Sequence, residues 1–158
     1  YGNRDYLFDK NTIPMGGENG GFGYEIPPEA LTDERFANMI REAEKYLGYP
    51  YVWGGASPST SFDCSGFVSW VINNCGNGWN VGRQTAAGVR SCCAYVPPEQ
   101  AKPGDLIFFQ GTYDTPGASH VGIYVGNQVM IHCGDPIQYA NISTPYWQQH
   151  FMAFGRLP

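Results

Sequence analysis

Three side chains in this sequence of 158 residues have the chemistry of nucleophilic catalysis: Cys64, His120 and His132. A cysteine thiolate is a nucleophile, a histidine can take the thiol proton, and a second polar group can orient that histidine. Cys64 opens an apolar stretch with helical spacing, so it falls in the first turn of a predicted helix. Free N–H groups and the helix dipole favour thiolate there. The pattern predicts a Cys–His–His site.

The same residue types also have structural interpretations. A cysteine that leads an apolar helix is most often a small buried residue. Asp63 would then be only an N-cap, His120 a structural side chain and Arg83 an exposed charge. The five cysteines are an odd number, and none has the spacing of a metal site, so the cysteine count favours one functional thiol and no metal. They are Cys64, Cys75, Cys92, Cys93 and Cys133.

Three helices and three strands are predicted to position these side chains. The first helix is capped by Thr32 and ends at Gly48, and the second starts at Cys64 and closes at Gly76 and Gly78. Their buried faces are Phe36, Met39, Ile40, Ala43 and Leu47 in the first helix, and Phe67, Val68, Val71 and Ile72 in the second. A shorter helix is expected over 84–91, and strands over 105–110, 120–125 and 128–133. Helices followed by antiparallel strands indicate an α+β fold.

The register of the hairpin around Gly126 decides whether the histidines share a face. A two-residue loop at Gly126–Asn127 would place Val121 opposite His132 and put the histidines on opposite faces. An odd register, made by a three-residue loop or a bulge, groups the apolar side chains on one face instead. These are Val121, Ile123, Val125, Val129, Ile131 and Cys133. We therefore expect the odd register, with His120 and His132 together on the other face.

Composition limits the class of protein. Apolar residues make up 42% and charged residues 15% of the chain, which predicts a folded domain rather than a disordered one. The net charge of −5 argues against nucleic acid as a partner. No apolar run approaches the ~20 residues that span a bilayer. Residues 1–30 read as a Gly-rich linker or N-terminal arm and 31–158 as a single domain.

Five short motifs occur in order along the chain. They are Y-V-W-G-G at 51–55, D-C-S-G-F-V at 63–68, P-G-D-L-I-F-F at 103–109, H-V-G-I-Y-V-G at 120–126 and I-H at 131–132. Together they make the chain resemble the NlpC family (NlpC/p60-type) of papain-like cysteine peptidases of bacterial cell walls. The resemblance covers about residues 36–157 and implies a papain-like α+β fold, with N-terminal helices packed on a central antiparallel sheet.

The resemblance implies roles residue by residue. Cys64 matches the nucleophile, His120 the general base and His132 the residue that orients the base. Substrate-binding positions are matched by Tyr51, Asp63, Ser65 and, more weakly, Arg83. Tyr51 also matches a group beside the oxyanion. The implied reaction is hydrolysis of the amide between γ-linked D-glutamate and a diamino acid, diaminopimelate or lysine, in peptidoglycan stem peptides. It requires no metal and no cofactor.

Asp63 beside the nucleophile is electrostatically unfavourable, because a carboxylate raises the pKa of a neighbouring thiol. Pairing of Asp63 with a substrate ammonium would explain this cost and would favour peptides with a free N-terminal L-alanine. Members of the family also cut intact wall stems, so both kinds of substrate stay open here.

Two rival functions and a cellular context complete the expectations. The chain could be another papain-like wall amidase or crossbridge endopeptidase, or a catalytically silent wall-binding module. By analogy with the family, we expect a secreted bacterial protein of the cell wall or exterior. By the same analogy, this chain would be the C-terminal module of a larger wall hydrolase, with a further wall-hydrolase domain upstream.

Overall fold

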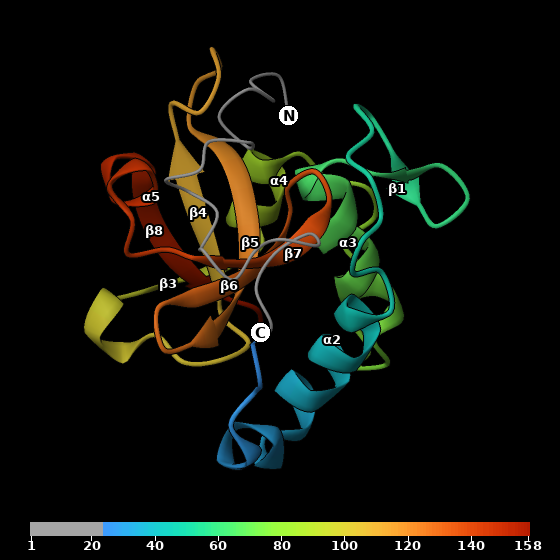
Figure 1. The fold of residues 1–158 in the computed structure, drawn as a ribbon, viewed down its shortest axis with the longest axis vertical. Coiled ribbons are helices and arrows are strands. Elements are labelled where there is room, and N and C mark those ends of the chain that lie inside the picture. Colours follow the sequence, from blue (N-terminus) through green and yellow to red (C-terminus); the bar gives the residue numbers. More distant parts are fainter. Residues whose placement is uncertain (1–23) are drawn as a thin grey trace.

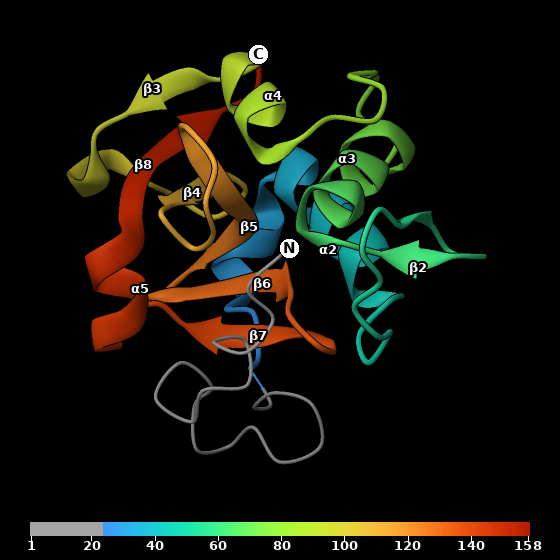
Figure 2. The same cartoon turned by 90° about the horizontal axis from the view of Figure 1, so that it is seen from above.

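The computed structural model describes residues 24–158, so the predicted arm lies largely outside the described residues. Figure 1 shows a central antiparallel sheet with the helices α2 and α3 on one side and α5 on the other. The view from above in Figure 2 shows the same arrangement. The α+β class and the packing of helices on an antiparallel sheet are confirmed.

Two helices on one side of the sheet follow the apolar periodicity of the sequence. They are α2 (Glu34–Glu44) and α3 (Cys64–Asn74). The side chains of Phe36, Met39 and Ile40 are buried, as predicted. The cap of α2 is Asp33 rather than Thr32, because the Asp33 carboxylate accepts hydrogen bonds from two first-turn N–H groups. Leu47 was wrongly placed on the buried face; the helix ends before it, and 40% of its surface is exposed.

The remaining helical elements are short. A 3-10 turn, η2 (Pro28–Thr32), precedes α2, and the predicted helix over 84–91 is present as α4 (Ala86–Ser91). A second 3-10 turn, η3 (Pro98–Gln100), and the helix α5 (Pro145–His150) were not predicted. None of the helices in the described part of the chain is long and apolar enough to cross a membrane.

The main sheet has six antiparallel strands in the order β3-β8-β4-β5-β6-β7. The three predicted strands are its centre: β4 (Leu106–Gln110), β5 (Ala118–Gly126) and β6 (Val129–Cys133). The sequence did not predict β3 (Ala94–Val96), β7 (Ile137–Asn141) and β8 (Phe151–Arg156). A separate two-stranded sheet, β1 (Ala56–Ser57) with β2 (Ser61–Phe62), lies before α3.

The hairpin β5–β6 has the odd register that the sequence predicts. Tyr124 pairs with Met130, whereas Gly126 pairs with Val129, so the ladder shifts by one residue between these two pairs. The turn itself has two residues, Asn127 and Gln128, both with positive φ. The bulge therefore restores the register that a two-residue turn alone would have lost. His120 and His132 lie on one face of the sheet as a result.

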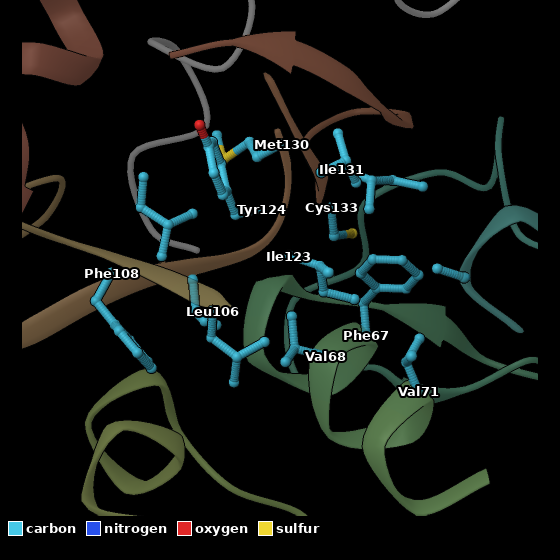
Figure 3. Packing of buried hydrophobic residues seen from close by; sticks show 14 of the residues in the cluster. Phe67, Val68, Val71, Leu106, Phe108, Ile123, Tyr124, Met130, Ile131 and Cys133 are labelled. Atoms are coloured by element: carbon cyan, nitrogen blue, oxygen red, sulfur yellow. The ribbon is translucent and has the colours of Figure 1, made fainter. Parts of the chain in front are cut away.

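The apolar core lies between α3 and the opposite face of the sheet. Figure 3 shows Phe67, Val68 and Val71 of α3 facing side chains of the central strands. Among these strand residues, Ile123 and Cys133 are fully buried. This packing fixes the start of α3 against the ends of the strands, where the sequence places its candidate chemistry.

Candidate functional site

Cys64 is the first residue of α3 and lies against the beginning of β5. Its side chain is buried, and its thiol donates to the carbonyl oxygen of Ser119 at 3.9 Å. Ser119 directly precedes His120, so the helix start and the first histidine are neighbours. The close approach of α3 depends on Gly66, where a Cβ atom would lie 2.1 Å from the carbonyl oxygen of Gly55. The structure thus brings Cys64 to the histidine strand.

His120 and His132 form a direct pair. Nε2 of His120 lies 2.8 Å from Nδ1 of His132, and both rings are buried. Gly122 makes room for this contact, because a Cβ atom there would lie 2.7 Å from the Met130 sulfur and 3.2 Å from Cβ of His132. The two histidines are therefore positioned by two adjacent strands and by an absent side chain between them.

Trp147 of α5 contacts both histidines and was missed by the sequence analysis. Its ring stacks on that of His120 at 5.3 Å between centroids and meets that of His132 edge-on at 5.4 Å. Phe109 packs on Trp147 at 4.6 Å. The imidazole pair thus has an apolar aromatic wall. No local spacing or motif around Trp147 in the sequence signals this role.

Asp63 caps α3 and forms a buried ion pair with Arg83. One oxygen of Asp63 accepts from the Gly66 N–H at 2.7 Å, and the other accepts from Arg83 at 2.7 Å. Asp63 has no exposed surface, whereas 37% of the Arg83 side chain is exposed. Arg83 also donates to the Ser65 hydroxyl at 2.9 Å. Three of the four predicted substrate-binding residues therefore form one hydrogen-bonded cluster.

Tyr51 lies in a separate part of the site. It forms a parallel bridge with Phe62, and its backbone N–H donates to the Asp135 carboxylate at 3.1 Å. Its own hydroxyl is buried and has no hydrogen-bond partner in the part of the chain that the structure describes. Asp135, on the turn after β6, is a second residue that sequence analysis missed. Its distance of 84 positions from Tyr51 gives no sequence signal.

Burial sets the protonation states of the central groups. It raises the pKa of the Cys64 thiol, and the charge of Asp63 acts in the same direction. Burial lowers the pKa of His132 to about 3 and that of His120 well below its usual range, where His132 adds to the effect. The sequence predicts a thiolate at Cys64. Burial of this thiol acts against the effect of the helix N-terminus, because desolvation disfavours the charged form.

None of the five cysteines, all of which lie within residues 24–158, forms a disulfide. Cys133 is buried on the apolar face of β6, and its thiol donates to the carbonyl oxygen of Phe62 at 3.2 Å. Burial raises the pKa of Cys133 well above its usual value, and the charge of Cys64 contributes to that rise. No group of three or more potential metal-ligating side chains occurs within residues 24–158.

Known proteins resemble this chain in both sequence and fold. The model of the NlpC/P60 family matches residues 48–156. The bifunctional muramidase/DL-endopeptidase CwlT of Bacillus subtilis is 41% identical over 87% of this chain and 41% of its own length. The probable endopeptidase p60 of Listeria welshimeri is 44% identical over 75% of this chain and 22% of its own length. The chain thus spans less than half of these curated relatives.

Solved structures agree with the sequence comparison. An NLP/P60-family lipoprotein-like protein from Staphylococcus aureus superposes with a TM-score of 0.74 at 33% identity, over 98% of this chain and 60% of that one. The NlpC/p60 domain of the peptidoglycan hydrolase SagA superposes with a TM-score of 0.63 at 33% identity, over 78% of this chain and 98% of that domain.

Proposed function

Since this chain belongs to the NlpC/P60 family, we propose that it hydrolyses peptidoglycan stem peptides between γ-linked D-glutamate and the following diamino acid. The observation that carries the proposal is the His120–His132 contact of 2.8 Å beside the start of α3, where Cys64 lies. The names of relatives point the same way: one is a DL-endopeptidase, and another, from Bacillus subtilis and 37% identical, is a gamma-DL-glutamyl hydrolase. The bond occurs in bacterial walls, so the proposed location is extracellular.

Cys64 is the proposed nucleophile and His120 the proposed base. The Cys64 sulfur attacks the γ-carbonyl carbon while His120 takes the thiol proton. A neutral His120 protonated at Nε2 can donate to Nδ1 of His132. The lone pair on Nδ1 of His120 then remains available to take the thiol proton. The low pKa of His120 keeps this base neutral at pH 7. His132 therefore orients the base and stabilises the imidazolium that forms.

His120 also transfers the protons of the remaining steps. The C–N bond breaks, and the diamino-acid amine leaves with the proton held by His120, so a thioester remains on Cys64. Water then attacks the thioester while His120 takes a proton from it. The sulfur leaves, regains that proton, and releases the D-glutamyl acid. The hydroxyl of Tyr51 and the Cys64 N–H are the proposed donors to the oxyanion.

Mass spectrometry of defined stem peptides tests this function. L-Ala-γ-D-Glu-diaminopimelate and its lysine analogue, each with and without the disaccharide, are incubated with the protein and with Cys64→Ala. We expect a free diamino-acid fragment from the wild type and from Cys92→Ala, which removes a half-buried thiol outside the site. Cys64→Ala should leave every peptide intact.

Two other results would contradict the proposal. Cleavage at the sugar-to-L-alanine amide or at a crossbridge would assign the protein to another class of wall hydrolase. Binding of intact walls with every peptide left whole would indicate a silent binding module.

A further inference from the structure

Gln138 of β7 carries a buried oxygen that the fold does not use. The residue is 1% exposed, and its amide nitrogen donates to the carbonyl oxygen of Pro136 at 3.0 Å. This bond fixes the orientation of the amide, because a carbonyl oxygen only accepts. The other end of the amide, Oε1, has no hydrogen-bond partner within residues 24–158. A buried acceptor without a donor costs stability, so this oxygen needs an explanation.

The histidine pair has one proton that lacks an acceptor. In the proposed mechanism, Nδ1 of His132 accepts from Nε2 of His120, and burial lowers the pKa of His132 to about 3, so its ring is neutral at pH 7. A neutral imidazole has a single N–H, which must then be at Nε2. In the described part of the chain, Nε2 of His132 makes no hydrogen bond.

Gln138 and His132 are neighbours across two strands. They are directly opposite each other in the β6–β7 ladder, so their side chains leave the same face of the sheet. Gly134, just after β6, makes room for both. A Cβ atom there would lie 3.0 Å from Nε2 of Gln138 and 3.3 Å from Cε1 of His132, the carbon between the two ring nitrogens. A donor without an acceptor and an acceptor without a donor therefore occupy adjacent positions.

We propose that Gln138 is a positioning residue for the histidine pair: its Oε1 accepts the Nε2 proton of His132, directly or through one water. This inference rests on the proposed function and extends the Cys–His–His series by one residue. The acceptor holds the His132 proton at Nε2, so Nδ1 stays free to accept from His120. If the proton were at Nδ1 of His132 instead, it would be donated to Nε2 of His120. The proton of His120 would then be at its own Nδ1, where it could not take the thiol proton.

The tautomer of His132 tests the inference without any substrate. Nitrogen NMR of isotopically labelled imidazole rings distinguishes a protonated from an unprotonated ring nitrogen. At pH 7 we expect both histidines of the wild type to be protonated at Nε2. Gln138→Met keeps a side chain of similar size but removes the acceptor, so part of the His132 population should move its proton to Nδ1. A wild-type His132 protonated at Nδ1 would overturn the inference, whether or not the variant folds.

Peptide cleavage separates this role from a structural one. Gln138→Met should lower kcat per folded molecule by about tenfold or more and leave KM within about twofold, because the change acts through the histidines. Gln138→Glu loses the bond to Pro136 but keeps an acceptor, so it should retain most of the wild-type kcat. Gln148→Met is the matched control. It removes a similar amide bond, to the Ile142 carbonyl at 2.8 Å, from an exposed residue of α5, and should keep the wild-type kcat.

The other outcomes contradict the inference. If the amide only supports the turn at Pro136, Gln138→Glu and Gln138→Met lose the same activity, and the positioning role is wrong. If Gln138→Met keeps the wild-type kcat, solvent is a sufficient acceptor for the His132 proton, and the role is again wrong. If the wild type cuts no stem peptide, the proposed function fails. The tautomers of the wild type and of Gln138→Met then still decide whether Gln138 holds this proton.

Discussion

The molecule contains two buried aspartates that are each paired with a partly exposed arginine. Asp63 pairs with Arg83 at the start of α3, and Asp105 pairs with Arg156 where β4 begins and β8 ends. The aspartates have 0% and 1% of their side chains exposed, and the arginines 37% and 41%. By burial and pairing alone, the two sites are nearly the same.

They differ in how the arginine is used and in what lies next to it. Arg156 gives two nitrogens to Asp105, at 2.7 and 2.9 Å, so the pair clamps two strands together. Arg83 gives one nitrogen to Asp63 and the other to Ser65 and Gln84, beside Cys64. The comparison shows that a buried ion pair does not by itself indicate function. Only the Asp63 pair lies next to the proposed nucleophile, which is the first residue of α3.

Replacement of each aspartate should have the largest effects and should distinguish the two pairs by their effect on activity. Asp63→Ala and Asp105→Ala each remove a buried carboxylate together with its hydrogen bonds, and we expect each to lower the free energy of unfolding by about 2 kcal/mol. Only Asp63→Ala should reduce activity, by at least about a hundredfold, because it removes the cap that positions Cys64. Denaturant unfolding and peptide cleavage per folded molecule measure the two effects. Equal activity in the two variants would contradict a special role for Asp63.

The sequence predicts the parts of the site that depend on local periodicity. Apolar spacing placed Cys64 at the start of a helix, and strand alternation placed His120 and His132 on one face. Both inferences use side chains that follow one another within a few positions. The prediction of Thr32 as the cap was wrong, because the neighbouring Asp33 can accept from the same N–H groups and does so in the structure.

Other features could not be predicted because their partners are distant in the chain. Asp105 and Arg156 lie 51 positions apart, and Asp63 and Arg83 lie 20 apart. No periodicity links such pairs. The outer strand β3 has three residues, which is too short for a clear alternation in the sequence. Burial, which acts against the thiolate expected at Cys64, also depends on packing that helix position does not show.

The pH dependence of stability tests whether the two buried histidines are neutral in the folded protein. The folded pKa of His132, about 3, and of His120 lie below the value of about 6.5 for an exposed histidine. The unfolded chain therefore binds more protons between these values, so stability is fully present above pH 6.5 and is lost as pH falls towards 3. The slope should reach about 1.4 kcal/mol per pH unit for each histidine.

Two variants test whether the histidines cause this pH dependence of stability. His132→Asn should remove about half of it, whereas Trp147→Phe keeps both histidines and an apolar wall and should retain it even if overall stability falls. Urea unfolding at several pH values measures the slope. An unchanged slope in His132→Asn would show that other groups titrate.

The smallest change in stability is expected at Tyr51. Its hydroxyl is a proposed substrate contact, whereas the hydroxyl of Tyr46 has partners within the fold. The Tyr51 hydroxyl is buried with no partner among residues 24–158, whereas the Tyr46 hydroxyl donates to Glu42 at 2.7 Å and accepts from Trp70 at 3.0 Å. Tyr51→Phe should therefore change the free energy of unfolding by less than about 0.5 kcal/mol, and Tyr46→Phe should lower it by about 1–2 kcal/mol. Activity should show the reverse order, with a loss of about tenfold or more for Tyr51→Phe alone. If Tyr51→Phe destabilises the fold as much as Tyr46→Phe does, its hydroxyl is a structural group and the oxyanion role is wrong.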